Sequence, residues 1–233
     1  NLYGHDLVPA GGYYGAQAAL RPLHAQYSYD DGSVVLVNTG RRAAAGLSLR
    51  ITAFDLDGGV RLDETREGLG VDGSAATEVF RLSEDPDGVS GAYFLRLVLR
   101  DGAGRQVDRN VYWLSTRRDT LDVRNAQWHY TPQDEYADLT GLQDLPRTKV
   151  TVTAASTARG DGRITTEVTI ANDTAGGPVA FLARAVIRKG AGGAALPAVR
   201  WSENYVTLWP GESVTLTAEY LRADLGRAVP HVE

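Results

Sequence analysis

Residues 201–220 contain two runs in which apolar and polar side chains alternate, and the dipeptide Pro210-Gly211 separates the runs. A period of two is typical of a β-strand that buries one face and exposes the other. Proline sets φ for the first position of a tight turn, and glycine accepts the positive φ that the second position can require. The sequence therefore predicts two strands joined at a Pro-Gly corner, an arrangement typical of a β-sandwich.

The same alternation occurs in both halves of the chain. Residues 47–53 and 93–99 carry apolar side chains at every second position in the first half. We expect these apolar faces to form a core, and the intervening side chains, Arg96, Val98 and Arg100 among them, to face solvent. In the second half the pattern returns over residues 150–152, 164–170, 179–187 and 214–220.

The length and the strand pattern predict an all-β chain with two antiparallel sandwiches. At 233 residues, each half has about 100 residues, the size at which a two-sheet sandwich of about seven strands closes. One helix is expected over Gly12–Leu20, where the sequence is rich in alanine and ends before Pro22. A segment of different composition, Trp128–Pro146, separates the halves, and we expect it to cover one end of the second sandwich.

Composition excludes several classes of function. Lysine and arginine number 24 against 29 acidic residues, for a net charge of −5, so no basic field is expected to attract nucleic acid. No apolar run approaches the ~20 residues of a membrane helix, and no membrane partner is expected. The absence of cysteine excludes disulfides, thiolate nucleophiles and cysteine zinc sites.

Three segments resemble a known family of enzymes. They are Tyr13–Asn38, the pair Tyr130-Thr131-Pro132 and Tyr136–Leu142, and the pair Glu203-Asn204-Tyr205 and Pro210-Gly211-Glu212. Together they resemble the C-terminal part of glycoside hydrolase family 2 exo-β-D-glucosaminidases and their β-mannosidase relatives. The resemblance implies two tandem immunoglobulin-like β-sandwiches, over residues 22–125 and 126–233, with residues 1–21 as the tail of a (β/α)8 barrel that lies outside this chain.

The resemblance also implies what the chain lacks. In this family two glutamates of the barrel hydrolyse the glycosidic bond with retention, which needs carboxyl groups about 5–5.5 Å apart. No acidic residue here matches those motifs, so no catalytic residue is expected, and the barrel of the same polypeptide is the expected partner. The implied parent removes β-linked glucosamine from chitosan-type oligosaccharides. A β-mannosidase or an endo-β-mannosidase of glycoproteins, acting on mannose-containing oligosaccharides, is the alternative.

Aromatic side chains are the candidate binding surface. The six candidates, all within residues 126–233, are Trp128, Tyr130, Tyr136, Trp201, Tyr205 and Trp209. Their faces could stack on sugar rings, which would make this region a carbohydrate-binding module. Alternatively, some belong to the sandwich core and the others form an interface with the barrel. We favour core and interface roles over sugar binding.

The other motifs in the sequence do not indicate a metal, cofactor or modification site. The four histidines are scattered without ligand spacing, and no metal or cofactor is expected. The run Asp55–Gly59 has a passing likeness to a calcium loop but is better explained as a hairpin turn. Asn172-Asp173-Thr174 is formally a glycosylation sequon and equally a turn.

The first residue, Asn1, and the absence of methionine indicate a piece of a larger protein. The absence of cysteine is compatible with a reducing cytoplasm, but many exported bacterial proteins lack cysteine as well. We expect the parent to be secreted or periplasmic, with a cytoplasmic location as the alternative.

Overall fold

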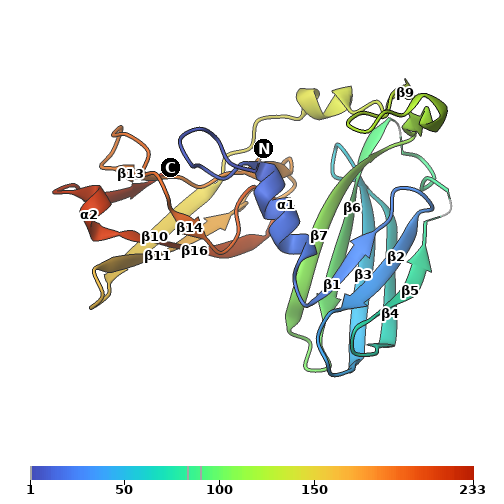
Figure 1. The fold of residues 1–233 in the computed structure, drawn as a ribbon, viewed down its shortest axis with the longest axis horizontal. Helices are drawn as coiled ribbons and strands as arrows, with labels where there is room; N and C mark the ends of the chain where they lie inside the picture. The colour runs from blue at the N-terminus through green and yellow to red at the C-terminus, as the bar shows by residue number, and fades with distance from the viewer. Residues whose placement is uncertain (1, 83, 90) are drawn as a thin grey trace. The chain divides into compact units, whose positions relative to one another are not determined.

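The computed structural model describes residues 2–82, 84–89 and 91–233, and most of its regular structure is antiparallel β-strand (Figure 1). Contacts divide the chain into two compact units. The first sandwich unit is Ala18–Leu145, and the second sandwich unit combines Asn1–Gln17 with Pro146–Glu233. Each unit has its own cluster of buried apolar side chains, so each is described separately below.

The first sandwich unit consists of a three-stranded and a four-stranded sheet, both antiparallel. The three-stranded sheet has the order β1 (Leu23–Tyr27), β2 (Ser33–Asn38), β5 (Ala75–Arg81). The four-stranded sheet has the order β4 (Val60–Val71), β3 (Ala44–Asp55), β6 (Ala92–Arg100), β7 (Gln106–Ser115).

The predicted core faces of the first sandwich are confirmed. Along β3 the side chains of Leu47, Leu49 and Ile51 are buried, and in the neighbouring strand β6 Leu97 and Leu99 are buried as well. The register pairs Leu49 with Leu99 and Ile51 with Leu97, so these side chains share one face of the sheet. Alternation in the sequence thus sets which face of each strand enters the core.

The opposite face of β6 is also covered, and the expectation that it faces solvent is wrong for two of its three residues. Arg96 and Val98 are each 9% exposed, whereas Arg100 is exposed as expected. The guanidinium of Arg96 lies 4.8 Å from the ring centroid of Phe54, which is itself buried. Stacking of a guanidinium on an aromatic face permits this burial of an arginine.

The second sandwich unit is built on a four-stranded sheet with two pairs of short strands. The sheet has the order β10 (Thr151–Ala158), β11 (Arg163–Ala171), β16 (Ser213–Leu221), β14 (Arg200–Trp201). The pairs are β12 (Ala180–Ala183) with β15 (Val206–Leu208), and β13 (Ile187–Lys189) with β17 (Pro230–Val232). A short helix, α2 (Arg222–Leu225), follows β16.

The predicted helix near the start of the chain is confirmed as α1 (Gly11–Ala19). Its Tyr14 is 6% exposed and belongs to the apolar core of the second sandwich unit. The chain leaves the helix before Pro22, because a residue that precedes proline disfavours the helical conformation. Helix and second sandwich are therefore linked through a shared core.

The predicted Pro-Gly corner is confirmed between β15 and β16. The Glu212 amide donates to the Trp209 carbonyl at 3.0 Å, and Gly211 has a φ of 82°. Proline at the second position and a positive φ at the third are the features of a type II turn. The Glu212 carboxylate closes the corner by accepting the Trp209 amide at 2.9 Å.

The turn predicted at Asp55–Gly59 is also confirmed. It connects β3 to β4, with the Gly58 amide donating to the Asp55 carbonyl at 3.0 Å and Gly58 at a φ of 88°. The Asp55 carboxylate forms an ion pair with Arg61, and Asp57 accepts the Gly59 amide. These aspartates therefore stabilise a hairpin.

Contacts group the segment after β7 with the first sandwich unit, whereas we expected Trp128–Pro146 to cover one end of the second sandwich, and that expectation stays a prediction. Residues 116–145, here called the capping segment, contain β8 (Thr120–Leu121), the 3-10 helix η1 (Val123–Asn125), β9 (Gln133–Glu135) and the 3-10 helix η2 (Thr140–Asp144). The Asp138 amide donates to the Ser115 hydroxyl at the end of β7 and so ties the segment to the sheet, and the Asp119 carboxylate accepts the Ala137 amide within the segment. These long-range bonds have no local sequence signal.

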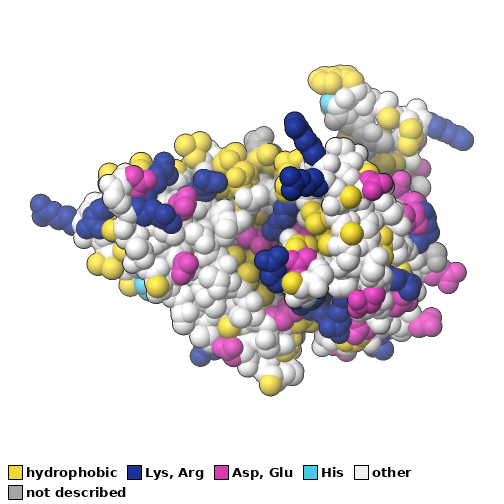
Figure 2. Space-filling view, turned by 90° about the horizontal axis from the view of Figure 1, so that it is seen from below, with side chains coloured by type: hydrophobic (Ala, Val, Ile, Leu, Met, Phe, Trp, Pro, Cys, Tyr) yellow, Lys and Arg dark blue, Asp and Glu magenta, His cyan; other side chains and the backbone are white. Residues whose placement is uncertain are grey.

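Among the described residues, no helix is both long and apolar enough to cross a membrane. Basic and acidic side chains are interspersed on the face drawn in Figure 2.

Candidate functional site

The six predicted aromatic residues fall into two groups, one in each sandwich unit. Trp128, Tyr130 and Tyr136 lie on the capping segment of the first sandwich unit and are 96%, 55% and 59% exposed. Trp201 and Trp209 belong to the second sandwich unit and are buried, and the half-buried Tyr205 lies beside them in the sequence. The sugar-binding or interface role of the six stays a prediction, but only the first group presents free ring faces to solvent.

Local hydrogen bonds hold the exposed group in place. The Asp122 carboxylate caps η1 by accepting the Asn125 amide, and Gln127 and Tyr130 form an isolated β-bridge around the tip. This tip carries Trp128, whose ring contacts that of His129 with centroids 4.7 Å apart. The indole is thus displayed on a closed turn, an arrangement that suits contact with a partner surface or a ligand.

The buried group has a structural role in the second sandwich unit. Trp201 is part of the apolar core. The ring of Tyr205 packs on that of Tyr14 at 5.8 Å, and the Arg184 guanidinium lies 5.8 Å from the Tyr205 centroid. Tyr205 itself has a φ of 55°, which is rare for a residue with a side chain.

Asn204 stabilises this backbone conformation. Its side-chain oxygen accepts the amides of Ala185 and Tyr205, at 2.9 and 3.0 Å, and its side-chain nitrogen donates to the Ala185 carbonyl at 2.9 Å. Asn204 is 5% exposed, so these bonds are formed away from solvent. The segment Glu203-Asn204-Tyr205 therefore fixes a loop between sheets rather than a binding surface.

Burial also changes the acidity of the Tyr14 hydroxyl group. Desolvation raises the pKa of Tyr14 to about 12, although a hydrogen bond with the Asn204 side chain acts in the opposite direction. A buried phenol resists ionisation because the phenolate would lose its hydration. Tyr14 consequently remains neutral over the physiological range.

Asn172 is unsuitable for glycosylation in the folded chain. Its side chain is fully buried, and its nitrogen donates to the carbonyls of Pro178 and Leu208 at 2.9 and 3.1 Å. Its backbone amide and carbonyl pair with Glu212 and Gly211. The sequon residue therefore anchors the Pro-Gly corner to the neighbouring loop.

Acidic residues that are adjacent in the sequence lie in separate environments. Asp134 and Glu135 are exposed on β9, and Asp85 accepts a hydrogen bond from the Tyr93 hydroxyl at 2.8 Å. Across the described parts of the chain, no group of three or more histidine or acidic side chains is arranged to hold a metal ion.

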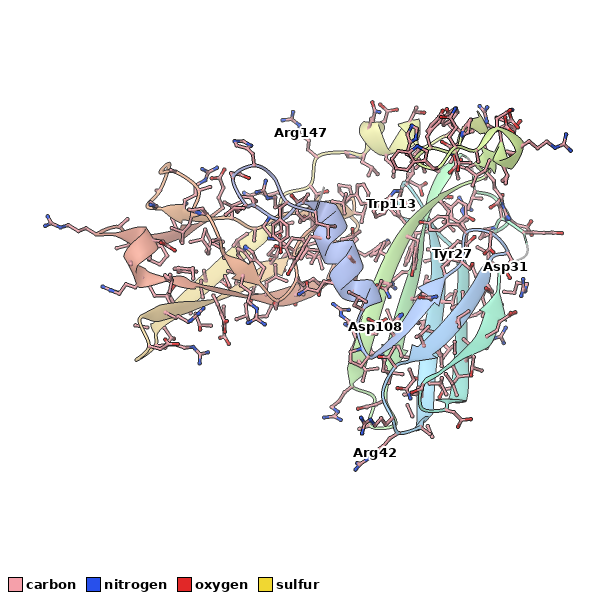
Figure 3. The ribbon with its side chains drawn as sticks, in the orientation of Figure 1. Tyr27, Asp31, Arg42, Asp108, Trp113 and Arg147 are labelled. Carbon is pink, nitrogen blue, oxygen red and sulfur yellow. The ribbon has the colours of Figure 1, made fainter. Side chains whose placement is uncertain are left out.

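A cavity that the sequence did not predict lies in the first sandwich unit. It has a volume of about 550 Å³, and its lining includes Tyr27, Tyr29, Tyr93 and Trp113. These residues come from β1, the corner after it, β6 and β7. Tyr27 and Trp113 are labelled in Figure 3. The sequence offers one local signal, the closely spaced Tyr27 and Tyr29, but the other two rings join them only through the fold.

Comparison with known proteins gives the family of both units. Residues 128–233 match the family described as the exo-β-D-glucosaminidase Ig-fold domain. Residues 31–119 match the mannosidase Ig/CBM-like domain. The two domains are immunoglobulin-fold domains of the exo-β-D-glucosaminidase and mannosidase type.

Relatives of these immunoglobulin-fold domains are much longer proteins. An exo-β-D-glucosaminidase of Streptomyces avermitilis is 47% identical over 227 residues, which cover 97% of this chain and 25% of that protein. The corresponding enzyme of Amycolatopsis orientalis is 43% identical, with 95% of this chain and 21% of that protein covered. The chain thus spans about a quarter of the length of the curated relatives it matches.

Solved structures of related enzymes contain the same fold as this chain. The crystal structure of Amycolatopsis orientalis exo-chitosanase CsxA superposes with a TM-score of 0.94 and 40% identity, over 100% of this chain and 27% of that one. A β-D-mannosidase from Dictyoglomus thermophilum has a TM-score of 0.58 and 13% identity, which shows a shared fold.

The matches leave the predicted domain boundary open. The Ig-fold match begins at residue 128, close to the predicted start at 126, whereas contacts group residues up to Leu145 with the first sandwich. The predicted division into 1–21, 22–125 and 126–233 therefore stays a prediction.

Proposed function

We propose that the chain is a non-catalytic scaffold of a family 2 glycoside hydrolase whose catalytic barrel lies in the same polypeptide. The observation that carries the proposal is the 47% identity to an exo-β-D-glucosaminidase over 97% of this chain, which corresponds to only 25% of that protein. Immunoglobulin-fold sandwiches supply a rigid support. In keeping with a structural role, the aspartates of Asp55–Gly59 stabilise a hairpin turn.

The parent enzyme acts, in this proposal, on chitosan-type oligosaccharides and releases β-linked glucosamine with retention of configuration. Support comes from the relatives named exo-β-D-glucosaminidase. Because chitosan is a polymer that does not cross a membrane intact, we also propose that the parent is secreted or periplasmic. Activity in the culture medium or periplasmic fraction tests this location.

The proposed activity is tested on the complete polypeptide that contains this chain. The expected result is release of glucosamine from the non-reducing end of a chitosan oligomer, with little release of mannose from β-mannosides. The reverse preference would favour the second candidate, a β-mannosidase parent. That candidate is supported by the match of residues 31–119 to the mannosidase Ig/CBM-like domain.

The scaffold role needs a separate test. Deletion of residues 126–233 from the complete polypeptide should lower its melting temperature or its soluble yield, and hydrolysis of small and polymeric substrates should fall together. A selective loss of activity on polymer, with normal cleavage of a small glycoside, would instead favour a carbohydrate-binding module in this region. The exposed Trp128, Tyr130 and Tyr136 are the observation behind that alternative.

A further inference from the structure

The cavity of the first sandwich unit has the size of a small-molecule site. Its volume of about 550 Å³ falls within the ~300–1,000 Å³ of typical ligand pockets. Strand ends form one wall, and the capping segment forms another through Arg117, Gln133 and Leu139. The cavity is thus built from segments that are distant in the sequence.

Aromatic rings supply the apolar part of the lining. Tyr27 and Tyr29 meet edge to face, with centroids 5.4 Å apart, and Tyr112 supports both rings from behind at 5.7 and 6.1 Å. The Tyr112 hydroxyl accepts the Tyr27 amide at 3.1 Å, which fixes the corner. Tyr27 and Tyr93 are buried, whereas Tyr29 is 63% exposed at the rim. Such rings offer flat faces to the C–H groups of a ligand.

Polar groups of both signs complete the lining. It contains the carboxylates of Asp30, Asp85 and Asp119 and the guanidinium groups of Arg117 and Arg118. The near balance of charge disfavours a strongly anionic or strongly cationic ligand. Carboxylates accept and guanidinium groups donate, so together they satisfy hydroxyl groups, which do both.

The wall made by the capping segment is fixed by hydrogen bonds. The Ser115 hydroxyl accepts the amides of Arg117 and Asp138, each at 3.1 Å. The Asp119 carboxylate accepts the Ala137 amide at 2.8 Å. These bonds join the two ends of the capping segment before any ligand arrives, which reduces the entropic cost of binding.

We propose that this cavity binds a neutral pyranose oligosaccharide, with a sugar face on Tyr29 and hydroxyl groups bonded to Asp85, Arg118 and Gln133. Flat aromatic faces together with mixed donors and acceptors match the amphipathic surface of a pyranose ring. This site is separate from the aromatic tip at Trp128, and it does not depend on the catalytic activity proposed for the parent.

The test is a titration of the 233-residue chain with N-acetylchitotetraose and with mannotetraose, by calorimetry and by NMR of the indole N–H groups. At least one tetrasaccharide should bind with a Kd below about 1 mM. The Trp113 signal, assigned with Trp113→Phe, should shift, and those of the buried Trp201 and Trp209 should stay in place. Tyr29→Ala should weaken binding about tenfold through loss of the rim ring.

Tyr130→Ala is the matched control, because Tyr130 is similarly exposed in the same unit and does not line the cavity. It should leave the affinity unchanged. A reversed result, with binding lost in Tyr130→Ala and kept in Tyr29→Ala, would assign sugar binding to the capping-segment aromatics and overturn the proposal. So would the absence of binding by either neutral sugar up to about 10 mM.

A glucosamine tetramer, whose ammonium groups would meet the carboxylates of Asp30, Asp85 and Asp119 as well as the guanidinium groups of Arg117 and Arg118, should bind no more tightly than the better neutral tetrasaccharide. Tighter binding of the charged oligomer would contradict the assignment of a neutral ligand. Asp85→Asn keeps the shape of the side chain and distinguishes a loss of sugar binding from misfolding. It should preserve the melting temperature and lower the affinity about threefold. Failure of all these sugars to bind would leave the proposed glucosaminidase activity of the parent untouched.

Discussion

At the scale of single residues, Asp108 connects two strands of the first sandwich unit. Its carboxylate accepts the Arg21 guanidinium at 2.8 Å, the Ala25 amide at 3.0 Å and the Asn110 side-chain nitrogen at 3.0 Å. Because Asp108 is 2% exposed, its removal takes away a buried acceptor that all three donors share.

Asp108→Ala should therefore lower the free energy of unfolding by about 3 kcal/mol. Denaturant unfolding followed by circular dichroism measures the change. Asp144→Ala, at an exposed position, is the control and should change stability by less than about 0.5 kcal/mol. A cost for Asp108→Ala as small as that of the control would show that the buried carboxylate does not stabilise the fold.

Tyr14 makes stability depend on alkaline pH. Its folded pKa of about 12 lies above the ordinary value of 10.0, so folding favours the protonated phenol. This contribution is fully present below pH 10 and is lost as the pH rises towards 12. Tyr14→Phe should thus lose stability less steeply than the native chain between pH 10 and 12, as measured by urea unfolding. Tyr130→Phe, at an exposed position, should follow the native curve.

At the scale of elements, alternation in the sequence was sufficient to predict the inward faces of β3 and β6. It was wrong for the run 179–187, predicted as one strand, which the structure divides into β12 and β13 of two different sheets. It was insufficient for the outward face of β6, because Arg96 is covered through a long-range contact with Phe54. The position of the capping segment likewise depends on a long-range bond, from the Asp138 amide to the Ser115 hydroxyl, for which the sequence has no local signal.

The candidate aromatics show the same limit. Tryptophan and tyrosine occur in cores as well as on binding surfaces, so residue type could not distinguish the buried Trp201 from the exposed Trp128. Tyr27 and Trp113 line one cavity although they are far apart in the sequence. The Tyr27 amide bonds to the hydroxyl of Tyr112, the residue before Trp113, which lies 85 positions further along the chain. Only the fold brings such residues together.

Strand β10 is an edge strand with a hazard for self-association. All eight of its residues are exposed, none is charged, and among the described strands only β11 pairs with it in the sheet. Uncharged edges of this kind pair with other chains. Ala155→Lys should reduce self-association at high concentration, because it places a charge on the edge opposite Glu167 of β11.

Sedimentation velocity at increasing protein concentration measures this effect. Thr169→Lys is the control, because it adds the same charge to the inner strand β11 and leaves the edge uncharged. Equal suppression by both variants would indicate that net charge, and not protection of the edge, governs association.

At the scale of the whole molecule, the two compact units have separate apolar cores and separate polar anchors. Asp108 is the buried polar anchor of the first sandwich unit. Asn172 is that of the second, where it bonds the carbonyls of Pro178 and Leu208. Units of this size, with independent cores, are able to unfold separately.

Calorimetry of the native chain should therefore resolve two unfolding transitions. Asp108→Ala should lower the midpoint of one transition and Asn172→Ala that of the other, each on the order of 10 °C, because the lost hydrogen bonds destabilise only the unit that contains them. The double variant should show both shifts with little coupling, since the sites have no common partners. If each single variant lowered both midpoints equally, the chain would unfold as one cooperative body, and the stability of either sandwich would depend on the other.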